Sequence, residues 1–141
     1  MRENMGLYRG KRLDNGEWVE GAFCPKCWSL SCGREVAGPR IIKLDAPHSG
    51  VWFAVNPSTV GQFTGLLDKN GKWIFEGDVV LKRTYNGKKA FPVEFGGGMF
   101  YCGFGGGSST ATHRYTLEDK QIEVIGNIHD NPELLEVNKN D

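Results

Sequence analysis

The sequence predicts a nearly all-β protein of mainly antiparallel strands with short connections. Asn-Gly pairs occur three times, at Asn15-Gly16, Asn70-Gly71 and Asn86-Gly87, each between strand-like segments. Such a pair favours the two-residue hairpin turn, because both of its central residues need a positive φ. Twenty glycines and six prolines punctuate the remaining apolar runs. No segment has the i, i+3, i+4 and i+7 apolar spacing of a long amphipathic helix.

The elements follow in order along the whole chain. Apolar and aromatic runs predict strands at residues 7–13, 17–23, 41–44, 51–55, 73–75, 79–81, 91–95 and 121–128. Residues 56–60 indicate a turn or a single helical turn. The glycine-rich residues 103–112 predict a mobile loop. Near the end, Asn131 as cap and Pro132 at the first helical position predict a short helix before a polar tail.

Composition narrows the class of protein. With 141 residues and 16 aromatic side chains, the chain can form one domain or two small subdomains around a packed core. Lysine plus arginine equals aspartate plus glutamate, 17 against 17, which argues against a protein that mainly grips phosphates. No apolar run is long enough to cross a bilayer, and the N-terminus does not read as a secretory signal. We therefore expect a cytoplasmic protein without a membrane partner.

Three sequence blocks carry a family resemblance. YRGKR and DNGEWVEG lie within residues 8–21, TVGQFTGL, DKNG and IFEGDVV within 59–80, and EVIGNIHDNPELL at 123–135. In this order they resemble the YopX family, small proteins encoded mainly in bacteriophages and prophages. The resemblance implies an intracellular setting in a bacterial host and a C-terminal part like an SH3-type barrel. It brings no agreed activity, so no catalytic residue is carried over.

With that resemblance, we expect an N-terminal β subdomain at residues 1–60, an SH3-like barrel at 61–130, and a short helix and tail at 131–141. Glu76 and Asp78 could be read as catalytic carboxylates, but a turn leading into a barrel strand is the preferred interpretation. Asp68, like Asp78, can fix a turn by bonding nearby amides. We assign a structural role to the signature residues Gly65, Asn70, Gly71, Glu76, Gly77, Asp78, Gly126, Asn127, Asn131 and Pro132.

The cysteines raise the sharpest chemical question. Cys24 and Cys27 form a Cys-x-x-Cys pair with Cys32 close by, and such a pair can hold zinc from a single turn. The fourth ligand could be Cys102, His48 or His113, since no second Cys-x-x-Cys exists. Reduced thiols without metal are the alternative, and a redox dithiol is disfavoured without a βαβ context. We therefore predict no cofactor and leave zinc as an open hypothesis.

Function is narrowed to binding rather than catalysis. The preferred prediction is a phage or prophage accessory protein that is not an enzyme and binds a host or phage protein, with self-association also open. The alternative is a nucleic-acid-binding small barrel that uses Lys82, Arg83, Lys88 and Lys89 beside Tyr85. An enzyme of unknown type ranks third, because no catalytic constellation is evident.

Overall fold

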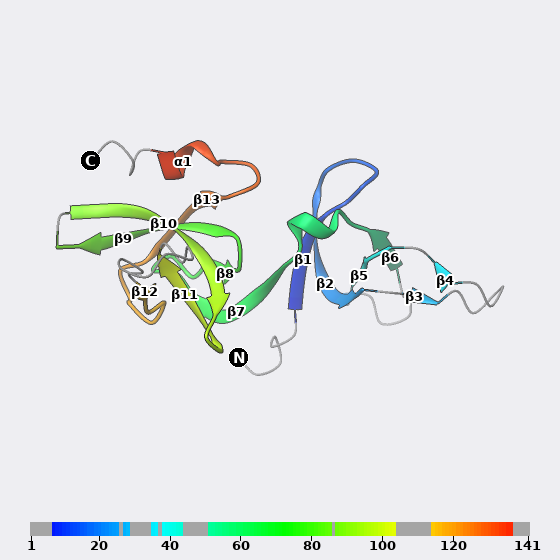
Figure 1. Cartoon of the computed structure of the whole chain (residues 1–141), viewed down its shortest axis with the longest axis horizontal. Helices are drawn as coiled ribbons and strands as arrows, with labels where there is room; N and C mark the ends of the chain where they lie inside the picture. The colour runs from blue at the N-terminus through cyan, green and yellow to red at the C-terminus, as the bar shows by residue number, and fades with distance from the viewer. Residues whose placement is uncertain are drawn as a thin grey trace. The chain divides into compact units, whose positions relative to one another are not determined.

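A computed structural model describes residues 7–25, 27–28, 35–36, 38–43, 51–85, 87–103 and 114–136, and its strands are shown in Figure 1. All strand pairings of the described residues are antiparallel, which confirms the predicted fold class. None of the described helices is long and apolar enough to span a membrane. The chain divides into two compact units, residues 1–63 (unit 1) and 64–141 (unit 2).

Unit 1 is built on an antiparallel sheet in the order β6-β5-β2-β1-β7. Its strands are β1 (Leu7–Lys11), β2 (Trp18–Cys24), β5 (Arg40–Lys43), β6 (Val51–Ala54) and the start of β7 (Gly61–Leu67). A separate two-stranded sheet pairs β3 (Cys27–Trp28) with β4 (Glu35–Val36). The 3-10 helix η2 (Pro57–Thr59) is the single helical turn expected there. Val19, Ile41 and Val55 form the buried core.

Unit 2 contains a five-stranded sheet in the order β12-β11-β10-β9-β13, and β8 (Trp73–Phe75) pairs with β7. The sheet strands are β9 (Asp78–Thr84), β10 (Gly87–Gly96), β11 (Met99–Gly103), β12 (Arg114–Tyr115) and β13 (Glu123–Asn127). Within β7, Gly65 has a φ of +86°, a left-handed value that favours glycine. The core consists of Ile74, Val80, Phe91, Val93, Cys102, Leu117, Ile122 and Val124.

The turn at Asn70-Gly71 differs from the two-residue geometry predicted above. No described residue other than glycine has a positive φ, so Asn70 is not left-handed, whereas Gly71 has a φ of +80°. Asp68 donates its amide to the Lys72 carbonyl at 2.8 Å, which leaves three residues in the loop. The Asp68 carboxylate also accepts from the Asn70 and Lys72 amides, and so it holds the turn in this longer form.

The C-terminal helix is present, but its predicted side-chain cap is wrong. Helix α1 (Glu133–Glu136) begins directly after Pro132. The Asn131 side chain accepts from the Asn127 amide at 3.3 Å, while only its backbone carbonyl accepts from Leu134, at 3.1 Å. The Asn131 amide oxygen therefore fixes the turn between β13 and α1 instead of the first turn of the helix.

Candidate functional site

The Asp68 carboxylate is a buried acceptor that joins the second sequence block to strand β13. Its Oδ1 accepts from the Asn70 and Lys72 amides, each at 2.8 Å, and its Oδ2 accepts from the Val124 amide at 2.9 Å. Burial raises the pKa of Asp68, but the three amide donors outweigh this, and the pKa lies below its ordinary value. All of these contacts are to backbone, so the side chain serves the fold.

The Glu76-Gly77-Asp78 segment forms the turn between β8 and β9. Asp78 is 1% exposed, and its Oδ2 accepts from the Phe75 amide at 2.7 Å. Gly77 has a φ of +92° and donates its amide to the Val93 carbonyl at 2.9 Å. Glu76 is half-buried. Two catalytic carboxylates would both have to reach a substrate, and the buried Asp78 is instead directed at its own backbone.

The third sequence block packs a turn against β13. A Cβ on Gly126 would lie 2.6 Å from Asn131 Oδ1 and 2.8 Å from Leu134 Cδ1, so only glycine fits without displacing both side chains. The Asn127 Oδ1 accepts from two backbone amides of the turn, at 3.0 and 2.9 Å. Pro132 then leads into α1. These residues, too, are engaged in backbone geometry.

The four basic residues predicted for nucleic-acid binding lie on two faces of the β9–β10 hairpin, which projects on the left in Figure 1. The register pairs Arg83 with Lys88 and Lys82 with Lys89. Because side chains alternate along a strand, the two pairs face opposite sides. The Lys82 side chain is 11% exposed and donates to Asp119 at 2.7 Å. The structure therefore brings Arg83 and Lys88 together and separates them from the other pair.

Arg83 and Lys88 belong to a pocket of about 110 Å³ in unit 2. Lys69 also lines this pocket and forms an ion pair of 3.2 Å with Glu123. Within the described ranges, no carboxylate forms an ion pair with Arg83 or Lys88. The complete lining, which we call the basic pocket, is Lys69, Leu81, Arg83, Lys88, Gln121 and Glu123.

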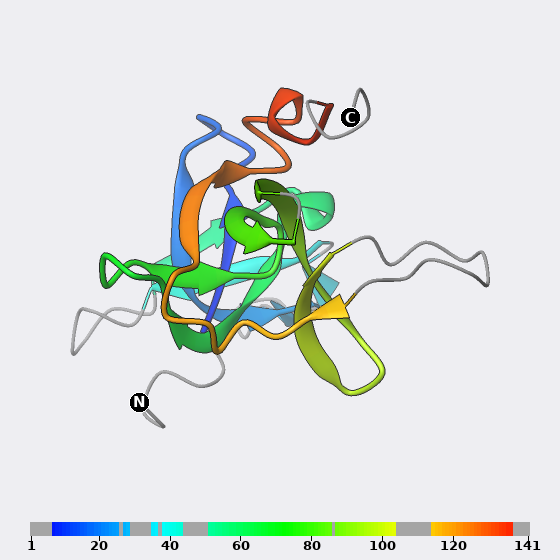
Figure 2. The same ribbon diagram turned by 90° about the vertical axis from the view of Figure 1, so that its left-hand side faces the viewer.

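A second exposed surface is the apolar tip of the β10–β11 hairpin, which projects in yellow-green at the lower right of Figure 2. Phe95 is 54% exposed, and its ring centroid lies 4.9 Å from that of Phe100. Met99, which the register pairs with Gly96 at the same tip, is 47% exposed and lies on the other face from the two rings, because side chains alternate along a strand. Sequence reasoning missed this apolar tip. The sequence feature that could have indicated it is that Phe95 and Met99 flank three consecutive glycines.

Polar contacts hold the opposite face of that hairpin. Tyr101 is buried and donates its hydroxyl to the Glu94 carboxylate at 3.0 Å. Burial is the main cause that raises the pKa of Tyr101, and this hydrogen bond raises it further. The Arg114 guanidinium lies 4.6 Å from the Tyr101 ring. A Cβ on Gly97, which has a φ of +60°, would lie 2.8 Å from Arg114 Nη1. Glycine here lets Arg114 pack across the turn, so the apolar tip is presented in a defined conformation.

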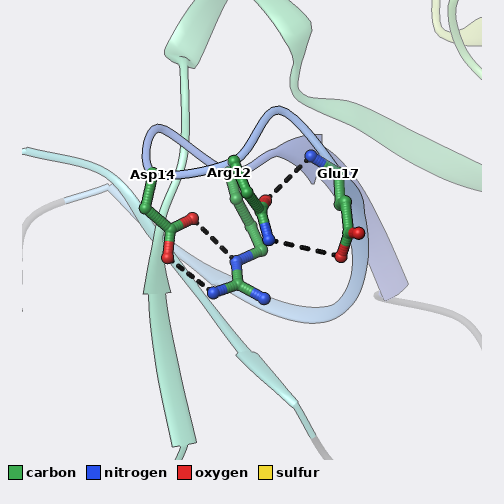
Figure 3. A network of polar contacts seen from close by, with 4 residues as sticks. Arg12, Asp14 and Glu17 are labelled. Atoms are coloured by element: carbon green, nitrogen blue, oxygen red, sulfur yellow. Dashed lines mark hydrogen bonds and ion pairs between the residues drawn. The ribbon is translucent and has the colours of Figure 1, made fainter.

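The basic residues in and directly after β1 already contact other side chains of unit 1. The Arg9 guanidinium and the Lys11 ammonium lie 4.8 and 5.5 Å from the centre of the Trp18 ring. Arg12 donates twice to Asp14, at 2.9 and 2.6 Å, as Figure 3 shows. These hydrogen bonds lower the pKa of Asp14. The cations of Arg9 and Lys11 therefore already contact the Trp18 ring, and the cation of Arg12 is already paired with Asp14.

The cysteines do not form a metal centre within the described residues, where no group of three or more His, Cys, Asp or Glu could hold an ion. Cys24 is half-buried at the end of β2. The Cys27 side chain, Cys32 and both candidate histidines lie outside the described residues. Cys102 is fully buried in the core of unit 2, and burial raises its pKa to about 11. Zinc binding by Cys24, Cys27 and Cys32 stays a prediction, which metal analysis of reduced, chelator-free protein will test.

Comparison with known proteins places the chain in a family. The crystal structure of protein EF1440 from Enterococcus faecalis is similar, with 26% sequence identity and a TM-score of 0.50. That likeness covers 91% of this chain and 96% of the other. No curated protein matches at a significant level. The family model described as YopX protein matches residues 8–136. Because the match spans nearly the whole sequence, the chain belongs to the YopX family.

Proposed function

We propose that this chain is a phage or prophage accessory protein that acts without catalysis, by binding a host or phage protein in the bacterial cytoplasm. The apolar tip of the β10–β11 hairpin carries this proposal. Phe95 is 54% exposed and Met99 is 47% exposed at the tip of one hairpin of unit 2. Phenylalanine and methionine are enriched in the buried centres of protein interfaces and are costly to leave in water.

The geometry of the hairpin supports a protein partner. A tilted contact between the Phe95 and Phe100 rings restrains one ring, and the Tyr101–Glu94 hydrogen bond holds the strands beneath it. A preorganised apolar tip loses little side-chain entropy on docking. The partner would offer an apolar pocket that receives Phe95, with Met99 on the other face of the same tip. The Asp68 and Asp78 carboxylates of the second sequence block are turned inward to backbone amides, which favours binding over catalysis.

The test is photo-crosslinking in a bacterial host, with a photoreactive residue at position 99. We expect one specific crosslinked protein, lost when Phe95→Ser is combined with the photoreactive residue. Leu13→Ser is the matched control, because Leu13 is 65% exposed and belongs to unit 1. It should leave the crosslink unchanged. Equal loss with both serine variants, or crosslinks only to a second copy of the chain, would contradict the proposal.

A further inference from the structure

Two positively charged side chains of the basic pocket lie directly opposite each other on neighbouring strands. Arg83 and Lys88 are cross-strand partners on the same face of the β9–β10 hairpin, and both line the pocket. Like charges directly opposite each other on adjacent strands destabilise a sheet. Such an arrangement favours binding of an anion that lies between the two cations.

Carboxylates neutralise two other lysines of unit 2. Lys82, on the opposite face of the hairpin, has Asp119 at 2.7 Å. Lys69, across the basic pocket, has Glu123 at 3.2 Å. The single carboxylate in the pocket is thus already paired, and the pocket keeps two positive charges in excess. We propose that the basic pocket binds a phosphate group of single-stranded nucleic acid, with a base stacked on Tyr85.

The dimensions and the neighbouring side chains favour this ligand. A volume of about 110 Å³ suits a phosphate group better than a whole nucleotide. The planar guanidinium of Arg83 matches two phosphate oxygens. Tyr85 follows Arg83 by two positions at the tip of the hairpin and is fully exposed. An exposed ring beside cations is the arrangement by which small β-barrels stack unpaired bases, whereas bases in a duplex have no free face.

The experiment is fluorescence anisotropy with a labelled oligothymidylate of about 12 nucleotides, a length that fits one small barrel. We expect binding at low salt that weakens as salt rises. Arg83→Ala and Lys88→Ala should each weaken binding about five-fold. Each should also lower the slope of log K against log salt by about 0.7, the value for one lost phosphate contact on a single strand. Tyr85→Ser should weaken binding about five-fold without changing this slope.

Lys72→Ala is the matched control, because Lys72 is an exposed lysine of unit 2 outside the pocket. It should bind as the wild type does, and so should Phe95→Ser, which separates this site from the apolar tip. Thermal unfolding checks that each variant folds, with Lys88→Gln as the substitute if Lys88→Ala does not. The proposal is overturned if the oligonucleotide does not bind at low salt, or if Lys72→Ala weakens binding as much as Lys88→Ala does. It is also overturned if polyglutamate displaces the labelled oligonucleotide as well as unlabelled oligothymidylate does.

Discussion

Replacing Asp68 with asparagine tests whether one buried carboxylate organises unit 2. Asparagine keeps a carbonyl oxygen that can accept from the Asn70 and Lys72 amides. It turns its own NH₂ group toward the Val124 amide, which now has no acceptor. A hydrogen bond to a charged group contributes about 1.5–3 kcal/mol, and a buried unsatisfied N–H costs about 1–3 kcal/mol. These effects overlap, so we expect Asp68→Asn to lower the free energy of unfolding by about 2–4 kcal/mol.

The same substitution has a pH signature. Because the folded pKa of Asp68 is lowered, its stabilising effect is fully present above the unfolded pKa of about 3.9 and is lost as the pH falls through the folded value. Asparagine does not titrate. The difference in stability between wild type and Asp68→Asn should therefore be largest near neutral pH and should shrink below about pH 4.

Urea unfolding followed by circular dichroism at several pH values measures both effects. A loss of 2 kcal/mol corresponds to a fall in Tm of at least about 8 °C for a unit of this size. Glu118→Gln is the control, because Glu118 is an exposed carboxylate of unit 2 and surface substitutions stay within about 0.5 kcal/mol. The reasoning fails if Asp68→Asn stays within about 0.5 kcal/mol of the wild type, or if its deficit does not depend on pH.

Three further predictions follow from single contacts. Gly21→Ala would place its Cβ 1.9 Å from the Ile42 carbonyl oxygen, so we expect a loss of at least about 2 kcal/mol in urea unfolding. Cys102, with a pKa of about 11, should resist iodoacetamide at pH 8 in the folded protein and react in urea, as peptide mass spectrometry will show. Lys82 lowers the pKa of Asp119, so Asp119→Asn should lose less Tm between pH 5 and about pH 3 than the wild type does.

Strand positions could be predicted from the sequence because turn chemistry is local. The Asn-Gly pair at Asn70-Gly71 correctly marked a connection between strands, but it did not determine the number of residues in the loop. That number depends on the carboxylate of Asp68, which also bonds Val124 56 positions away. A local sequence pattern does not show which distant residues will come into contact, so the type of turn was predicted less well than its position.

The binding surfaces were predicted less well, for a related reason. The basic run at residues 82–89 suggested one patch, yet the strand period of two places neighbouring lysines on opposite faces. Which face is neutralised depends on Asp119, 37 positions beyond Lys82. Exposure of Phe95 depends likewise on how β11 pairs with β10. A charge or an aromatic ring can be read from sequence, but its solvent exposure is set by contacts made after folding.

Strand β13 explains why the second and third sequence blocks occur together. Its ladder with β9 is interrupted by a bulge between Val124 and Gly126, so strand pairing alone holds it less firmly. Hydrogen bonds to the turns of the second block compensate for the interrupted pairing. The Asp68 carboxylate accepts from the Val124 amide at 2.9 Å, and the Gly77 carbonyl accepts from the Ile128 amide at 2.8 Å. None of these bonds involves the tips of the β9–β10 and β10–β11 hairpins. Substitutions at those tips can therefore alter binding while leaving this framework intact.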